Sequence, residues 1–230
     1  YHRWWWQARD HDHDGLAEYG STDGSLAAAR WESGMDNAER FAGATMLENG
    51  AGQWSMDQAS ADLNAYLYVD AILLARFATQ LGQRRDALAL KSEADHLAKG
   101  VRARLFDPAS GLFSDRRMLD QHFVGHSGPE AWIPMWAGIA TPAQGRSVAR
   151  HLADPNTFDT PVPFPSLIRS DPAFDPERGY WRGPVWIDQA YFAVEGLQRT
   201  GYRGLARTSR DRLLRQAAGI DRKSTRLNSS

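Results

Sequence analysis

The sequence predicts an all-α fold in which antiparallel helical pairs stack side by side and are separated by long loops. Apolar residues recur at helical spacing in six segments after residue 54. Short turns join successive helices, and no strand–helix–strand alternation typical of a parallel sheet is visible. With 230 residues and 42% hydrophobic residues, the chain is large enough for a sizeable core.

The first helix is predicted over 57–82, where Gly82 provides a stop and apolar residues recur at a helical period, namely Leu63, Tyr66, Leu67, Ile72, Leu73 and Phe77. Further helices are predicted over 86–105, 128–140, 142–153, 183–201 and 204–219. The remaining segments are predicted as loop-rich chain over 1–54, a turn with a short hairpin over 106–115, and a long irregular loop over 155–176.

Composition excludes several classes of partner. The net charge of −1 argues against a general nucleic-acid or anionic-membrane partner, and no apolar run reaches the roughly 18 residues of a membrane span. The absence of cysteine excludes disulfides and thiolate metal sites. Because the chain starts inside a motif and without Met, we expect it to be truncated, and its localisation is unknown.

The last ten residues, DRKSTRLNSS, show no period and contain one large apolar residue, Leu227. This composition predicts a disordered tail, and it also resembles the translation of a sequencing adapter. We therefore expect residues 221–230 to lie outside the folded domain, and we expect the parent gene to continue beyond Ile220.

An acidic run near the start predicts a metal site. Within RDHDHDGLAEYG, alternate positions match positions 1, 3, 5, 7 and 9 of an EF-hand-type calcium loop, with Gly15 at the sharp turn. The predicted Ca²⁺ ligands are Asp10, Asp12, Asp14, the Leu16 carbonyl and Glu18. A structural calcium ion would cancel the repulsion between these carboxylates. Position 12 is Ser21 instead of the usual Glu, so the match is incomplete.

Three alternatives accompany the calcium site. A missing ligand is expected from elsewhere, with Asp70 as one candidate. The run also fits a solvated acidic turn without metal. A zinc site built from His2, His11 and His13 is weaker, because His11 and His13 alternate with the acids and are expected to point away from them.

Four motifs in the same order resemble glycoside hydrolase family 63, and the nearest members are its bacterial α-glucosidase-type proteins with a mannosyl-oligosaccharide glucosidase-like catalytic domain. The motifs are RDHDHDGLAEYG (9–20), RWESGMDNAERF (30–41), GPEAWIPMWAGIAT (128–141) and YWRGPVWIDQAYFAVEGL (180–197). The resemblance covers residues 4–220, which makes it much more specific than any single motif.

The resemblance implies a fold and an activity. The family's catalytic domain is an (α/α)6 barrel, so residues 1–220 are expected to form an incomplete barrel within one such domain. The family consists of inverting hydrolases of α-glycosidic bonds, and their general acid is the Asp of the S-G-M-D-N motif, here Asp36. The acidic run matches the family's calcium loop. A simpler alternative for Asp36 is a helix N-cap.

Inverting hydrolysis needs a second carboxylate, roughly 6.5–9.5 Å from the first. In the relatives this general base is a Glu in an E-N-Y-x-P-type motif after the helix that matches 204–219, and no Glu follows Glu195 here. We therefore expect the base to be lost beyond the C-terminus and the fragment to be inactive. Glu130 and Asp188 are expected to bind sugar hydroxyls or hold loops.

Aromatic and polar residues in the motifs are predicted to surround one terminal sugar. The predicted substrate-binding residues are Trp31, Met35, Asn37, Trp132, Tyr180, Trp181, Arg182, Trp186 and Asp188. Trp136 and Phe192 are expected in the core.

The expected function is exo-acting hydrolysis of a carbohydrate with a terminal α-linked sugar. Glucosides are the first expectation, and mannosylglycerate- or glucosylglycerate-type compounds are alternatives within the family. A non-catalytic, calcium-dependent carbohydrate-binding protein and a trehalase-like hydrolase remain competing interpretations.

Overall fold

The computed structural model describes the backbone of residues 1–227 and the side chains of residues 1–217. Within this range the α-helices are α1 (His2–Ala8), α2 (Leu26–Ser33), α3 (Ala61–Gln80), α4 (Arg84–Arg104), α5 (Ile133–Ala137), α6 (Pro142–Leu152), α7 (Ile187–Arg199) and α8 (Arg203–Leu227). Two short 3₁₀ helices are η1 (Glu39–Phe41) and η2 (Pro129–Ala131).

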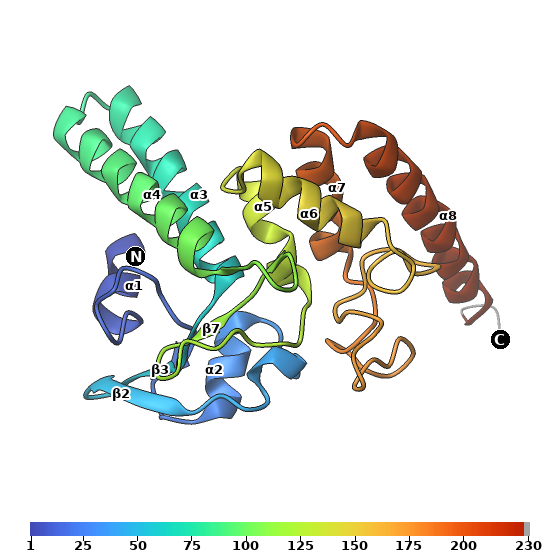
Figure 1. Cartoon of the computed structure of the whole chain (residues 1–230), viewed down its shortest axis with the longest axis horizontal. Helices are drawn as coiled ribbons and strands as arrows, with labels where there is room; N and C mark the ends of the chain where they lie inside the picture. Colours follow the sequence, from blue (N-terminus) through green and yellow to red (C-terminus); the bar gives the residue numbers. More distant parts are fainter. Residues whose placement is uncertain (228–230) are drawn as a thin grey trace.

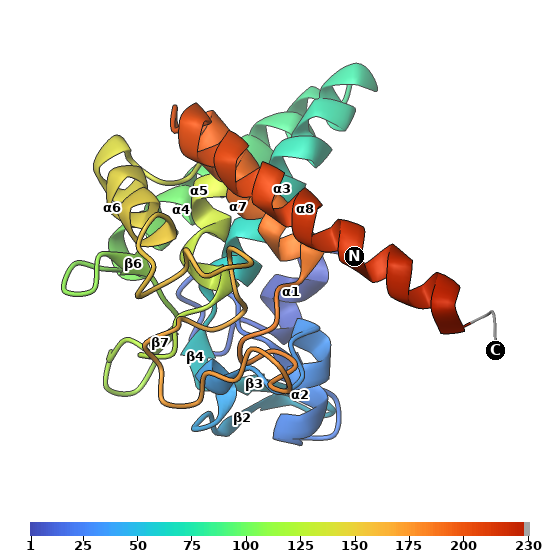
Figure 2. The ribbon, with the colours of Figure 1, turned by 90° about the vertical axis from the view of Figure 1, so that its right-hand side faces the viewer.

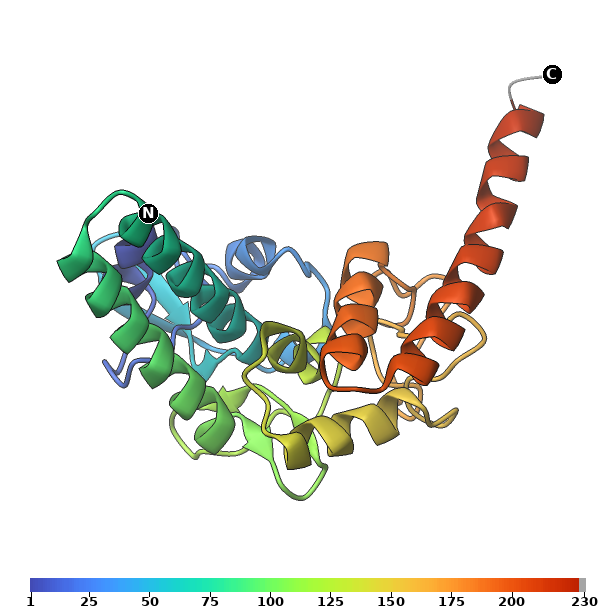
Figure 3. The same cartoon turned by 90° about the horizontal axis from the view of Figure 1, so that it is seen from above.

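The helices form an open arc (Figures 1 and 3). Along the arc α4 packs on α3, α3 on α5, α5 on α7, and α7 on α8. In Figure 2 the end of α8 extends away from the body. The predicted pairing of helices that follow one another in the sequence is confirmed for α3 with α4 and for α7 with α8, and the predicted barrel remains an expectation.

Helices α3 and α4 pack together, and both bury several small residues. Ala71, Ala75 and Ala78 of α3 are buried, as are Ala94 and Ala98 of α4. Alanines allow the two backbones to approach closely. Of the apolar residues that set the helical period of α3, Leu63 and Leu67 are buried, whereas Leu73 is 42% and Phe77 57% exposed near its end.

The first 54 residues are more ordered than predicted, and the fold is not purely α. Besides α1 and α2, this region contains the three-stranded antiparallel sheet β1–β3–β2. Its strands are β1 (Gly20–Ser21), β2 (Met46–Gly50) and β3 (Gln53–Met56). Two small sheets pair β4 (Gln58–Ala59) with β7 (Arg116–Arg117) and β5 (Phe106–Asp107) with β6 (Leu112–Phe113). The second of these confirms the hairpin predicted within 106–115.

Helix α2 was missed because it has almost no apolar periodicity: Ala29 is its one buried residue. Its ends nevertheless carry clear signals. The Ser25 hydroxyl accepts a hydrogen bond from the Ala28 amide at 3.2 Å, and Gly34 ends the helix at a φ of 73°. These are the preferred residues for a helix N-cap and a left-handed C-terminal turn.

The remaining helices follow the prediction with shifts at prolines. The segment 128–140 divides into η2 and α5 near Pro134, and α7 begins at Ile187 because the chain at Trp186 is still extended. Helix α6 starts at a capping box formed by Thr141 and Gln144. Between α6 and α7 the chain is irregular, as predicted.

Helix α8 extends to Leu227, whereas residues 221–230 were predicted to be disordered. Residues 221–227 contain neither Gly nor Pro, and Arg, Lys and Leu favour helix. Residues 228–230 lie outside the described part. Whether 221–230 belong to the natural protein remains a prediction. None of the helices described is long and apolar enough to cross a membrane.

Arg40 joins four segments of the core through a buried charge network. Its guanidinium donates to Asp62 at 2.6 and 3.0 Å and to both oxygens of Asp115 at 3.0 Å. Glu130 of η2 lies 3.7 Å from Arg40 Nε. All four side chains are at most 3% exposed. The network therefore connects η1 with the start of α3, the strand region near 115 and η2.

Glu130 is the least satisfied member of the network. Its Oε1 accepts a hydrogen bond from the Gly128 amide at 2.6 Å, and its buried Oε2 has no hydrogen-bond partner among the described atoms. Burial raises the pKa of Glu130 to about 8, opposed by Arg40 and assisted by Asp115 and Asp62. Glu130 therefore carries a proton at neutral pH.

Replacing Arg40 with Met is expected to destabilise the fold by about 3–5 kcal/mol, because it leaves buried carboxylates without their counter-charge. Urea unfolding measures the change. Arg210→Met is the matched control, since its pair with Asp211 is about half exposed and its loss is expected to cost less than about 1 kcal/mol. Equal losses in the two variants would contradict a central role for Arg40.

Glu130 also predicts a pH dependence. Its folded-state pKa lies above the ordinary value of 4.5, so its contribution to stability is full below that value and is lost as the pH rises through about 8. The free energy of unfolding of the wild type is expected to fall relative to that of Glu130→Gln between pH 5 and 8. Parallel profiles of the two proteins in urea titrations would refute a protonated Glu130.

Candidate functional site

The Asp36 segment is a tight turn between α2 and η1. Gly34 ends α2, and the Ala38 amide donates to the Met35 carbonyl at 3.0 Å, which leaves Asp36 and Asn37 at the tip. Asp36 is half-buried, and none of the described residues makes a hydrogen bond to its carboxylate. It does not cap a helix, since the residue before η1 is Ala38. Its carboxylate is therefore available to a ligand.

The aromatic residues of the YWRGPVW motif form a compact stack in the loop before α7. Trp181 and Trp186 lie parallel with ring centroids 4.0 Å apart, and Tyr180 meets Trp186 edge-on at 5.1 Å. The Trp186 indole donates to the Tyr180 carbonyl at 3.0 Å. Trp181 is buried and Tyr180 is 49% exposed, so this stack combines a rigid interior with an accessible aromatic face.

Asn37 joins the Asp36 turn to this aromatic loop. Its Nδ2 donates to the Gly179 carbonyl at 2.9 Å, and its Oδ1 accepts from the Trp181 amide at 2.9 Å. A second contact pairs Arg182 with Glu39 at 3.6 Å. The structure thus brings together two motifs that are more than 140 residues apart in the sequence.

Trp132 is a core residue, which corrects its prediction as a sugar contact. Its side chain is fully buried, packs edge-on against Phe158 at 5.2 Å and lies near Phe164, and donates to the Gln189 carbonyl at 3.0 Å. The motif around 128–141 therefore supplies packing. Trp136 and Phe192 also pack on the core, as predicted, with ring centroids 4.4 Å apart.

The other predicted binding residues differ in exposure. Trp31, on α2, is 73% exposed and presents a free indole face. Met35 is buried and its sulfur accepts from Arg40 at 3.4 Å, so it supports the turn from inside. Asp188 is exposed in the first turn of α7 and accepts from the Gln189 side chain at 3.1 Å.

A cavity of about 380 Å³ opens beside the end of α2. Its lining is Tyr1, Trp5, Tyr19, Glu32, Ser33, Leu63, Tyr66, Leu67 and Asp70. Glu32 and Ser33 belong to the same ESGMDN motif as Asp36. Aromatic walls with a few polar groups are typical of small-molecule sites. Sequence reasoning missed this cavity, because its lining comes from segments up to 69 residues apart.

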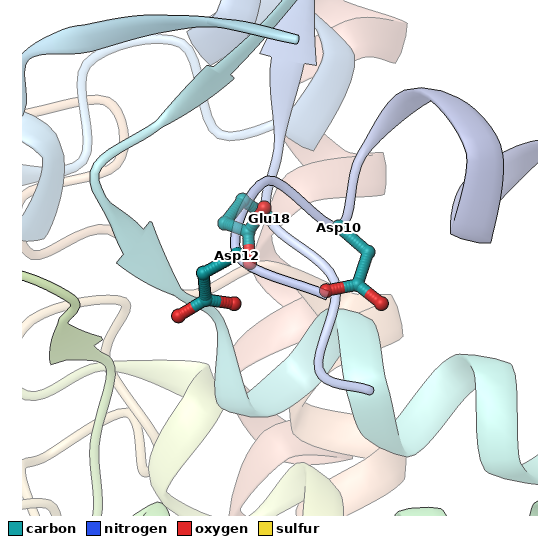
Figure 4. Close-up of side chains that lie close together, drawn as sticks. All are labelled: Asp10, Asp12 and Glu18. Carbon is teal, nitrogen blue, oxygen red and sulfur yellow. The ribbon is translucent and has the colours of Figure 1, made fainter. Parts of the chain in front are cut away.

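Three carboxylates of the acidic run converge (Figure 4). Ligand oxygens of Asp10, Asp12 and Glu18 lie within 4.8 Å of one another. Hydrogen bonds within the loop stabilise its turn: the Asp10 carboxylate accepts from the backbone amides of Asp14 and Gly15 at 3.1 and 3.3 Å. Gly15 adopts a φ of 80°, as the predicted sharp turn requires.

Asp14 departs from the predicted ligand ladder. It pairs with Arg104 of α4, and its Oδ1 accepts from the Leu16 amide at 2.9 Å. The Asp70 carboxylate, considered as an extra ligand, instead binds His2 Nδ1 at 2.6 Å. Among the described residues, the cluster of converging carboxylates therefore consists of Asp10, Asp12 and Glu18, without the predicted ligand Asp14.

The histidines do not form the alternative zinc site. His2 lies between Asp70 and Glu93, and its Nε2 is 2.5 Å from the Glu93 carboxylate. The His11 ring contacts the Asn49 side chain at 2.6 Å. Among the residues described, the grouping suited to a metal is Asp10, Asp12 and Glu18.

The donor set of this cluster fits a hard divalent cation. Glu18 is completely buried, and its Oε1 has no hydrogen-bond partner among the described atoms. Burial raises the pKa of Glu18 well above its usual range, and the neighbouring aspartates add to the effect. Burying a carboxylate without a partner is costly, and a bound cation would remove that cost. The carboxylates present therefore fit the predicted Ca²⁺.

Two residues that support the site were missed from the sequence. Glu39 and Arg40 follow the SGMDN motif after one residue, Ala38, and both contact other parts of the site. The sequence feature that could have indicated them is the presence of two charged residues shortly after a candidate acid. Their partners were not predictable, because Asp115, Glu130 and Arg182 lie at least 75 residues away along the chain.

Residues 1–224 match the family model described as "Mannosylglycerate hydrolase MGH1-like glycoside hydrolase domain". Among curated proteins, mannosylglycerate hydrolase MGH1 of Selaginella moellendorffii is 37% identical over 108 residues, which are 46% of this chain and 22% of that protein.

Two solved structures show the same fold. The glycoside hydrolase family 63 mannosylglycerate hydrolase of Thermus thermophilus, in complex with glucose, superposes with a TM-score of 0.73 at 20% identity, over 97% of this chain and 60% of that one. Neutral trehalase of Saccharomyces cerevisiae gives a TM-score of 0.64 at 21% identity, over 82% and 34%. The chain thus spans less than two thirds of the proteins that it matches.

Proposed function

Because the chain belongs to the mannosylglycerate hydrolase MGH1-like glycoside hydrolase domains of glycoside hydrolase family 63, we propose that it carries the acid-bearing half of an inverting α-glycosidase site. The observation that carries this proposal is the Asp36 turn. A half-buried carboxylate without a protein partner among the described residues lies at the tip of a turn that is hydrogen-bonded to a loop of stacked tryptophans.

Asp36 acts as the general acid. It donates its proton to the glycosidic oxygen as the bond to the sugar breaks, while water attacks the anomeric carbon from the opposite face. The rigid turn and its attachment to the 179–181 backbone keep the carboxyl group in place. Tyr180 and Trp31 offer exposed aromatic faces for the apolar side of the sugar.

The carboxylate that activates water is proposed to come from a part of the parent protein outside these residues. Glu130, Asp62 and Asp115 are engaged by Arg40, and Glu39 pairs with Arg182. These groups are better suited to hold the site than to act as base. The chain spans 60% of the solved family 63 relative, so the activity of the whole protein is part of this proposal.

The preferred substrate class is a mannosylglycerate-type compound, in which a terminal α-linked sugar is joined to a small acid. The support is that several relatives, including the Selaginella protein, are mannosylglycerate hydrolases. Simple α-glucosides are the second candidate. A calcium-dependent sugar-binding protein is the alternative of a different class, and stereochemical and mutational tests separate it from the enzyme.

We propose that Asp10, Asp12 and Glu18 hold a structural Ca²⁺, with the Leu16 carbonyl as a further ligand. When bound, the ion neutralises the carboxylates and joins the segment after α1 to the strand β1. Asp14 contributes through its pair with Arg104, which attaches the same loop to α4.

Asp36→Asn in the full-length parent enzyme is expected to lower kcat by about 10²–10⁴-fold with little change in binding, because it removes the proton donor alone. Hydrolysis of mannosylglycerate, followed by NMR, should release the sugar first as the β-anomer. Asp120→Asn, an exposed carboxylate on a turn, is the matched control and should retain activity.

Retention of configuration, or full activity of Asp36→Asn, would contradict the proposed mechanism. The 230-residue chain alone is expected to show less than about 1% of the parent's turnover, because removing one of two essential carboxyl groups costs about 10²-fold or more. Asp36-dependent turnover by the chain above that level would contradict the absence of a base.

Saturating Ca²⁺ is expected to raise the Tm of the chain by about 5 °C, since a ligand that binds only the folded state stabilises it. Asp12→Asn should remove most of this shift, because it replaces one carboxylate ligand by an amide without changing its size. Differential scanning calorimetry with and without chelator measures the effect.

Glu48→Gln is the control for this experiment, because Glu48 is an exposed acid on β2 outside the cluster. Its Ca²⁺ shift should equal that of the wild type. An unchanged wild-type Tm, or the same shift in all three proteins, would favour the solvated acidic turn instead.

A further inference from the structure

Both polar atoms of the Asn37 side chain bond to the backbone of the aromatic loop. One end of its amide donates to the Gly179 carbonyl and the other accepts from the Trp181 amide, both at 2.9 Å. Two hydrogen bonds from one planar amide fix both the distance and the orientation of the partner backbone. Asn37 was predicted to bind substrate, but these two bonds direct its amide to the loop.

The loop backbone is shaped to accept this amide. Tyr180, between the two bonded residues, has a φ of 59°, a conformation that L residues rarely adopt. Gly179 has no room for a side chain, because a Cβ would lie 2.4 Å from the Asp175 carbonyl oxygen. The Tyr180 carbonyl is held from the other side by the Trp186 indole. The loop therefore presents Gly179 and Trp181 to Asn37 in a fixed geometry.

We propose that Asn37 is a positioning residue that holds the Asp36 turn and the Trp181–Trp186 stack in one rigid unit. Asp36 is adjacent in sequence to Asn37, so displacement of the loop displaces the carboxyl group. The contact between Glu39 and Arg182 supports the same connection. The functional meaning of this unit rests on the proposed role of Asp36, whereas the connection itself is testable without any substrate.

The chain contains a matched control for this arrangement. Asn64 also bonds to backbone through both ends of its amide: its Nδ2 donates to the Ala17 and Ser60 carbonyls and its Oδ1 accepts from the Ala17 amide, all at 2.8 Å. Asn64 is buried and lies on α3, away from the aromatic loop. Asn64→Ala therefore removes an equivalent amide without removing the connection to Trp181.

The first experiment measures amide hydrogen exchange by NMR in the wild type, Asn37→Ala, Asn37→Asp and Asn64→Ala. In Asn37→Ala the Trp181 amide should exchange about tenfold faster, because it loses its acceptor. Asn37→Asp keeps an acceptor oxygen and the same size, so it should recover part of the protection even if Asn37→Ala folds poorly. Asn64→Ala should leave Trp181 exchange unchanged.

The second experiment titrates mannosylglycerate into the same proteins and follows tryptophan fluorescence. Binding by Asn37→Ala should be about tenfold weaker than by the wild type, and binding by Asn64→Ala should be equal to it. Unchanged Trp181 exchange in Asn37→Ala would overturn the connection. Faster exchange with wild-type binding would overturn its positioning role. A wild type without any response would count against the proposed substrate, while the exchange data would still decide the connection.

Discussion

The burial of one guanidinium among three carboxyl groups is the constraint on which the site depends. Arg40 compensates the charges on Asp62 and Asp115 and lies beside the protonated Glu130, and these three residues come from three other parts of the chain. None of these groups is stable in the interior alone, so the segments that carry them must meet around Arg40. Because Arg40 follows the Asp36 turn by four residues, the same constraint positions the candidate acid.

The candidate site is built outward from this core in two steps. Arg40 and the buried Met35 hold the turn from inside. Asn37 then attaches the turn to the aromatic loop, whose Trp186 indole and Gly179 backbone close the other side. The candidate acid thus lies on a support that several hydrogen bonds hold in place, an arrangement that favours accurate placement over flexibility.

In the acidic loop, as around Arg40, neighbouring carboxylates need compensating positive charge or hydrogen-bond donors. Repulsion among carboxylates is relieved partly by Arg104, which binds Asp14, and partly by backbone amides that donate to Asp10. Glu18 is left buried with an oxygen that lacks a partner among the described atoms. The proposed cation supplies what Arg40 supplies in the core, a positive charge where burial would otherwise oppose ionisation.

The sequence by itself determined the features that depend on local pattern: the helices over α3, α4 and α6, the sharp turn at Gly15 and the S-G-M-D-N motif. The tertiary structure decided which of these groups meet. It turned Asp14 toward Arg104, buried Trp132 in the core, and joined Asn37 to a loop more than 140 residues away. Helical periodicity and motif spacing reflect interactions between residues that are only a few positions apart in the sequence. Contacts across the fold depend on how the elements pack, which spacing along the chain does not encode.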